Sequence, residues 1–135
     1  MEGRSPGATL APWRDMSRDH RTLRVFRLAD ALVIDIYQAT KNFPPEERYG
    51  LQAQIRRAAV STATNIVEGC ARRGDREYVN FLNVATGSAA EVRYLCDLSH
   101  RLTLLQTNQA TNFEPRCREL VASLVRLMAS ADSTH

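Results

Sequence analysis

Five polar side chains recur at helical spacing in one segment of the chain and are the first candidates for chemistry. They are Arg57, Ser61, Asn65, Glu68 and Arg72. Residues three or four positions apart share one face of an α-helix, so this spacing predicts a polar stripe on a single helix. The same segment also carries apolar residues on two other faces. A helix with more than one apolar face usually packs against more than one partner.

Three interpretations of this stripe are open: a solvated helix face, a polar seam between helices, or a groove for nucleic acid. Serine and asparagine are poor helix formers, which argues against simple exposure. The next helical segment carries a matching polar line, and Arg–Glu pairs or amides that meet across two helices would fix their register. We favour a seam, within one subunit or between neighbours, that is formed by Arg57, Ser61, Asn65, Glu68, Asn80, Ser88 and Glu91.

A basic cluster follows the stripe at the junction of the two segments. Arg72, Arg73 and Arg76 flank Gly74 and are the best candidates for contact with nucleic-acid phosphates. The alternative is an ordinary solvated turn. Further arginines that precede the first helical segment could add to this charge, namely Arg14, Arg18, Arg21 and Arg24.

The residues needed for catalysis or metal binding are missing from the pattern. The histidines are His20, His100 and His135, and no Glu-x-x-His motif is present for a di-metal bundle. No phosphate-binding glycine loop and no G-x-S-x-G motif occurs. Glu68 and Glu91 are conceivable as paired carboxylates, but such pairs are usually structural. We predict no enzyme, no metal and no cofactor.

The composition is that of one ordinary globular domain. The chain has 135 residues, of which 44% are hydrophobic and 24% charged, with a net charge of +3. No membrane span and no secretory signal is recognisable, so we expect a cytoplasmic protein without membrane contact. An odd number of cysteines argues against a disulfide framework, and small core residues are expected at Cys70, Cys96 and Cys117.

The hydrophobic pattern predicts four helices over about residues 22–42, 45–72, 76–105 and 113–129. Residues 1–20 are expected to form a flexible tail and 131–135 a frayed end, with a polar connection over 106–112 and Pro115 in a first turn. Tyr37 and Leu102 are assigned to core-facing lines. Gly87 lies inside the third helix, which predicts close approach of another helix. The predicted fold is an all-α, antiparallel up-down-up-down four-helix bundle spanning residues 21–130.

Several ordered motifs resemble one protein family over about residues 24–105. They are Phe43-Pro44, Glu47-Arg48-Tyr49-Gly50-Leu51, Gln54-Ile55-Arg56-Arg57-Ala58-Ala59-Val60-Ser61, Asn65-Ile66-x-Glu68-Gly69 and Phe81-Leu82-x-x-Ala85-x-Gly87-Ser88-x-x-Glu91. The chain is similar in these motifs to the four helix bundle protein family, also called the 23S rRNA-intervening-sequence protein family.

The resemblance implies a four-helix bundle that assembles with itself into a barrel-shaped homopentamer. It also implies genes that can lie inside intervening sequences of large-subunit ribosomal RNA genes. A related group, the accessory proteins of diversity-generating retroelements, binds nucleic acid and a reverse transcriptase. The hypothesis is therefore a non-catalytic oligomeric module that binds RNA or a nucleoprotein partner of the reverse-transcriptase kind. The alternative is a purely structural homo-oligomer with no nucleic-acid role.

Overall fold

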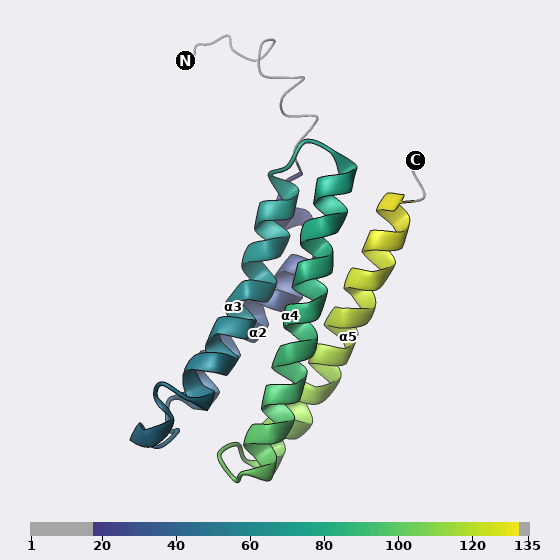
Figure 1. Ribbon diagram of the computed structural model, residues 1–135. Helices are drawn as coiled ribbons and strands as arrows, with labels where there is room; N and C mark the ends of the chain where they lie inside the picture. The colour runs from purple at the N-terminus through teal and green to yellow at the C-terminus, as the bar shows by residue number, and fades with distance from the viewer. Residues whose placement is uncertain (1–17, 133–135) are drawn as a thin grey trace.

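The computed structural model describes residues 18–132, and this part of the chain is all-helical, with four long α-helices and no β-strand. The helices lie side by side in an elongated bundle, and the turn between α3 and α4 is at the opposite end from the turn between α4 and α5 (Figure 1). The predictions made for residues 1–17 and 133–135 concern residues outside the described range. The elements are η1 (His20–Thr22), α2 (Arg24–Thr40), η2 (Pro45–Glu47), α3 (Leu51–Cys70), α4 (Asp75–Arg101) and α5 (Thr107–Asp132).

The core follows the three- and four-residue spacing of the apolar side chains. Along α2, for example, Ala29, Leu32 and Ile36 are at most 1% exposed. Burying a side chain such as leucine or isoleucine contributes roughly 1.5–3 kcal/mol. α3 packs against both α2 and α4, and α4 packs in turn against α5. One apolar face of α3, with Ile55 and Ile66, is therefore used inside the bundle, whereas the apolar residues of its other face, Ala53, Val60 and Val67, are half-buried.

The second predicted helix begins later than expected. Pro45–Glu47 forms only a short 3-10 turn, and α3 starts at Leu51. The Glu47 carboxylate accepts a hydrogen bond from the Leu51 backbone N–H at 2.9 Å, which satisfies one of the open donors of the first turn of α3. The prediction of one continuous helix from residue 45 was therefore wrong, because the chain bends at Gly50.

The end of α4 also differs from the prediction. The helix stops at Arg101, and Thr103 has a φ of 61°, a left-handed conformation that reverses the chain. Leu102 is 51% exposed and does not belong to the core line assigned to it, whereas Leu105 is buried. Tyr37 likewise lies at the surface rather than in the core.

The connection predicted over residues 106–112 is mostly helical. α5 begins at Thr107, so Pro115 lies inside the helix and not in its first turn. The buried Leu105 and Phe113 lie on either side of the polar segment, and α5 packs along α4. Tertiary packing thus outweighs the weak local preference of these residues for helix.

The three cysteines are buried and free of disulfide bonds, and burial raises the pKa of the Cys70 thiol.

Between residues 18 and 132, no helix combines the length and the apolar content that a membrane span requires. Ion pairs join α5 to α4 through Arg93 and Glu114, and to α2 through Arg24 and Glu119.

Candidate functional site

Two glycines show where α3 and α4 approach each other. A Cβ atom added at Gly69 would lie 3.0 Å from the Phe81 Cβ and 3.3 Å from the Tyr78 carbonyl oxygen, so only glycine fits there without movement. At Gly87, an added Cβ would meet no atom within 4 Å in the described part of the chain. The close approach predicted at Gly87 is therefore absent within the chain, and Gly69 is where it occurs.

Three of the predicted seam residues are connected by hydrogen bonds. The Ser61 Oγ on α3 and the Ser88 Oγ on α4 are 2.8 Å apart. The Asn65 side-chain amide donates to the Ser61 carbonyl oxygen at 2.8 Å and to its Oγ at 3.1 Å. All three side chains are half-buried. Either serine hydroxyl can donate to the other, since the Ser61 oxygen can accept from Asn65 and Ser88 together, and each such bond contributes roughly 0.5–1.5 kcal/mol.

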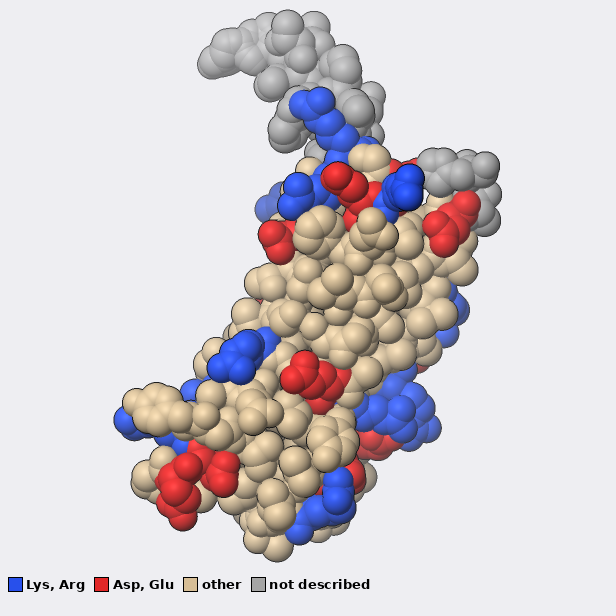
Figure 2. Space-filling model, viewed as in Figure 1, with Lys and Arg blue, Asp and Glu red and all other residues tan. Residues whose placement is uncertain are grey.

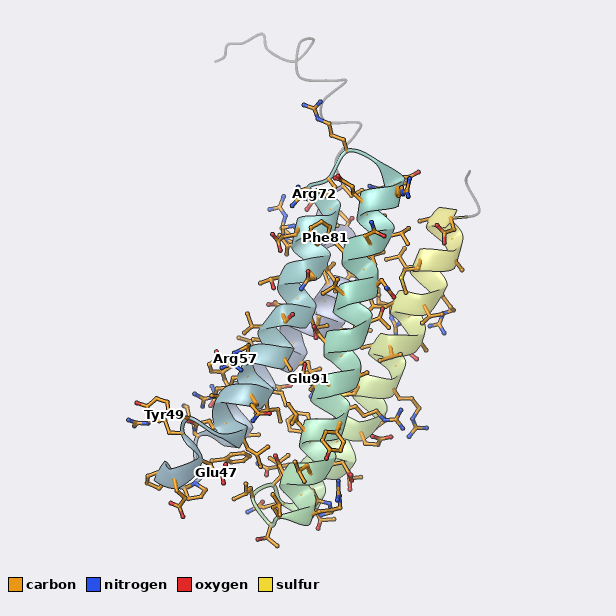
Figure 3. All side chains as sticks on the ribbon, in the orientation of Figure 1. Glu47, Tyr49, Arg57, Arg72, Phe81 and Glu91 are labelled. Carbon is orange, nitrogen blue, oxygen red and sulfur yellow. The ribbon has the colours of Figure 1, made fainter. Side chains whose placement is uncertain are left out.

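The charged members of the predicted seam are placed differently. Arg57, Glu68, Asn80 and Glu91 are exposed. None of these four side chains makes a hydrogen bond or ion pair with another of the residues 18–132. Figure 3 shows Arg57 on α3 and Glu91 on α4 on the same side of the molecule.

The register of α3 and α4 explains these positions. Contacts of Gly69 with Phe81 and of Ser61 with Ser88 show that earlier positions on α3 meet later positions on α4. Arg57, four residues before Ser61, is therefore level with Glu91, three residues after Ser88.

The same register separates the two carboxylates considered as a pair. Glu68 adjoins Gly69, which meets Phe81, whereas Glu91 lies ten residues further along α4. That offset corresponds to about 15 Å at 1.5 Å per residue. The structure thus does not bring Glu68 and Glu91 together for acid–base work. Within residues 18–132 there is also no group of three or more His, Cys, Asp or Glu side chains placed to hold a metal ion.

A stripe of α4 residues that are uncharged except for Glu91 lies beside Arg57. Val84 is 52% exposed and Tyr94 is 56% exposed, and the open Gly87 lies between them. In Figure 2, uncharged side chains cover a broad area along the middle of the molecule, interrupted by few charges. We call Val84, Gly87, Glu91 and Tyr94 the α4 face.

The basic cluster lies at the turn between α3 and α4. Arg72, Arg73 and Arg76 are exposed, and the Arg72 guanidinium lies 4.7 Å from the centre of the Phe81 ring. Figure 2 shows basic and acidic side chains together at this end of the molecule. The acidic neighbours in the chain are Asp75 and Glu77.

Arg18 reaches this same end from the start of the described chain. Its guanidinium lies 3.7 Å from the centre of the Tyr78 ring and forms an ion pair with Asp75. Burial raises the pKa of Tyr78 to about 12, so the phenol under this guanidinium stays neutral at physiological pH. Two of the other arginines that were considered pair elsewhere: Arg21 with Asp19 and Arg24 with Glu119.

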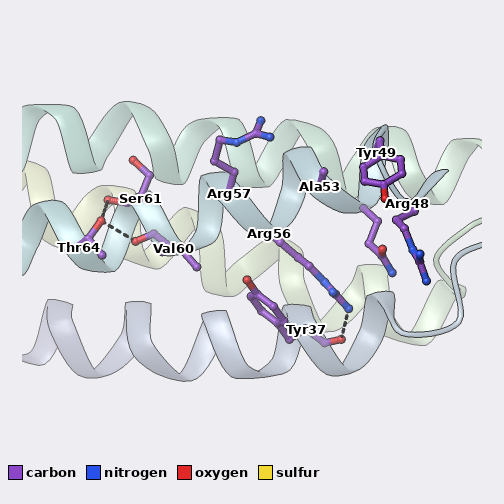
Figure 4. Close-up of a pocket in the computed structure, with 10 residues that line it drawn as sticks. Tyr37, Arg48, Tyr49, Ala53, Arg56, Arg57, Val60, Ser61 and Thr64 are labelled. Carbon is purple, nitrogen blue, oxygen red and sulfur yellow. Dashed lines mark hydrogen bonds between the residues drawn. The ribbon is translucent and has the colours of Figure 1, made fainter.

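A second charged surface, not predicted from the sequence, lies at the other end of α3. An open groove of about 700 Å³ runs between α2, the segment before α3, and α3 itself (Figure 4). It is lined by Tyr37, Arg48, Tyr49, Gln52, Ala53, Arg56, Arg57, Val60, Ser61 and Thr64. The adjacent Arg48 and Tyr49 were a sequence signal for a site that binds anions or bases, but nothing in the sequence indicated that they would line one groove with Tyr37.

The family can be assigned at this point. The model of the family described as 23S rRNA-intervening sequence protein matches residues 21–126. The chain belongs to this family. The family match extends beyond the sequence motifs to include most of α5, which the motifs did not cover.

A solved structure shares the fold. It is a protein of unknown function from the S23 ribosomal protein family of Bacteroides thetaiotaomicron VPI-5482, with a TM-score of 0.72 and 22% sequence identity. The match covers 78% of this chain and 95% of that one. No curated protein matches the sequence.

Proposed function

We propose that this member of the 23S rRNA-intervening sequence protein family is a non-catalytic interaction module that assembles with itself. In this proposal its four helices form an up-down-up-down bundle, and copies associate into a ring, five as the family resemblance implies. The observation that carries the proposal is the α4 face, with Val84 and Tyr94 exposed around the open Gly87.

Two physical arguments support self-association through this face. Glycine inside a helix costs about 1 kcal/mol relative to alanine, and close approach of a helix from another copy at Gly87 would offset that cost. Glu91 belongs to this face and Arg57 lies level with it on α3, and neither side chain bonds to another residue in the described range. Each is thus available to a complementary charge on a neighbouring copy.

The nucleic-acid part of the proposal concerns the α3–α4 turn. Arg72, Arg73 and Arg76 are exposed there, and Arg18 adds a guanidinium that is already paired with Asp75. In a ring, each copy would place its turn on the same rim, so the positive charge would be repeated around one edge. Such an edge suits the phosphates of RNA, alone or in a complex with a reverse-transcriptase-like protein.

Light scattering of the purified full chain tests the assembly. The expected mass is about five times the 15.2 kDa of one chain. Arg57→Ala and Glu68→Ala are expected to reduce that mass if the charged seam joins copies. A mass near one chain for the wild type would refute self-association, and intact rings in both variants would remove the seam from the interface.

RNA binding separates the proposal from its alternative, a scaffold with no nucleic-acid role. Fluorescence anisotropy with a labelled single-stranded RNA should show binding at low salt that weakens steeply as salt rises. The triple variant Arg72→Gln, Arg73→Gln, Arg76→Gln should bind less tightly and with a shallower salt dependence. Lys41→Gln, which removes a charge far from the turn, is the control. No binding by the wild type at low salt would favour the scaffold.

A further inference from the structure

The charged side chains that line the groove beside Tyr37 and Tyr49 are all positive. Its lining includes three arginines and no aspartate or glutamate. The Glu47 carboxylate, on the segment before α3, accepts a hydrogen bond from the first amide of α3, and Glu46 is exposed on η2 outside the lining. The groove is therefore suited to an anionic ligand.

The side chains of the three arginines differ in what they contact. Arg56 donates to the Thr40 hydroxyl at 2.8 Å and to the Tyr37 carbonyl oxygen at 3.2 Å, and its guanidinium lies 4.4 Å from the centre of the Tyr37 ring. Figure 4 shows it extended from α3 toward α2. Arg56 thus holds Tyr37 in place. The side chains of Arg48 and Arg57 make no hydrogen bond to another of the described residues. Arg57 is the residue proposed above to face a neighbouring copy, so Arg48 is the guanidinium left to contact a ligand in the groove.

Tyr49 supplies a flat, accessible ring at one end of the groove. Its side chain is 88% exposed. The backbone around it is fixed, because Gly50 N–H donates to the Glu47 carbonyl oxygen at 3.0 Å and Glu47 caps α3. An exposed aromatic ring on a fixed backbone beside arginines is the combination on which bases of single-stranded nucleic acids stack.

We propose that this groove binds single-stranded RNA, with a base stacked on Tyr49 and a phosphate contacted by Arg48. The proposal rests on the RNA-binding function proposed above and adds a separate surface to it. Tyr49 lies beside the start of α3 at Leu51, and the basic turn follows the end of α3 at Cys70. At 1.5 Å per residue the two ends of α3 are about 28 Å apart.

Single-stranded RNA fits these observations better than an acidic protein segment does. Both ligands offer negative charge to Arg48, but only RNA offers a planar base at every step for the ring of Tyr49. Because the groove is open to solvent rather than enclosed, a chain-like ligand can extend beyond it. A small enclosed ligand would lack the walls that normally bury most of its surface.

The test measures anisotropy of a labelled oligouridine RNA of about 12 nucleotides with the full chain. Tyr49→Ala should weaken binding about 5-fold to 100-fold, the range expected for loss of one stacked base. Tyr49→Phe keeps the ring and should bind within about 2-fold of the wild type, since stacking does not need the hydroxyl. Arg48→Gln should lower the salt slope by about 0.7, the value for one phosphate of a single strand. Tyr49 is so exposed that neither substitution threatens the fold.

RNA binding by Arg73→Gln and competition by poly-glutamate distinguish failure of the groove proposal from failure of the proposed function. If Tyr49→Ala binds RNA as the wild type does while Arg73→Gln binds less tightly, the groove proposal is overturned and the turn keeps its proposed function. If the wild type binds no RNA at low salt, both proposals fall. If poly-glutamate displaces the RNA and Tyr49→Ala has no effect, the groove is a general anion surface and the stacking proposal is overturned.

Discussion

Gly69 and Gly87 lie inside long helices but have opposite surroundings, which leads to opposite predictions for the same substitution. Gly69→Ala places a Cβ 3.0 Å from the Phe81 Cβ and 3.3 Å from a backbone oxygen. The free energy of unfolding should fall by about 1–3 kcal/mol, the usual cost of overpacking. Gly87→Ala meets open space and should raise the free energy of unfolding by about 1 kcal/mol.

Urea unfolding of dilute protein, followed by circular dichroism, measures both changes. All variants are compared at one concentration, because self-association adds stability by mass action. Equal effects of the two substitutions would contradict the difference in packing between the two positions.

At the same scale, the hydrogen-bonded serines were predictable and the groove was not. Ser61 and Ser88 lie on helical stripes whose spacing is visible in the sequence, so their meeting follows from packing the two stripes together. Tyr49 belongs to no periodic stripe. Its direction depends on the short turn of η2 and on the capping of α3 by Glu47, and these contacts depend on the folded chain.

At the scale of the element, the existence of the four helices was predictable and their ends were less so. Periodic apolar residues specify each helix, as for Ala29, Leu32 and Ile36 of α2. The polar run before Phe113 has no such pattern, and it is helical because Leu105 and Phe113 anchor both sides of it in the core. Local chemistry alone therefore placed the start of α5 too late.

The pairing of α4 with α5 has a predictable pH dependence. Hydrogen bonds from Arg93, and further ones from Arg118, hold the pKa of the Glu114 carboxyl below its ordinary value of 4.5. A folded-state pKa that is lower than the unfolded one gives stability that is present above pH 4.5 and is lost as the pH falls through the folded pKa. Glu114 is half-buried, so water still screens the pair, and the effect is small and weakens with salt.

The measurement compares Glu114→Gln with the wild type in urea unfolding at several pH values. Glu114→Gln should be less stable than the wild type at neutral pH and should lose less stability on acidification. Identical pH profiles would show that the Arg93–Glu114 pair does not tie α4 to α5. Asp97→Asn removes a carboxylate whose ion pair, among residues 18–132, is with Arg101 on its own helix, and it is the matched control.

At the scale of the whole molecule, the fold class was predictable from the pattern and the family from the motifs, but the outer surface was not. The same spacing that places Ala85 and Ala89 in the core leaves Val84 and Tyr94 outside it. Under the proposed function, these exposed apolar residues on the far side of α4 are covered by another copy of the chain. The charged side chains of Arg57 and Glu91 therefore provide the decisive test of this assembly.

Exchanging the charges of Arg57 and Glu91 tests whether copies pair through them. Arg57→Glu alone and Glu91→Arg alone each place like charges together at the proposed interface, so each should shift the mass in light scattering toward one chain. The double variant restores opposite charges and should recover the mass of the wild type. Both positions are exposed, so circular dichroism should show unchanged helix in all three. If both single variants keep the full mass, these charges do not lie between copies, and an uncharged part of the α4 face must hold the assembly instead.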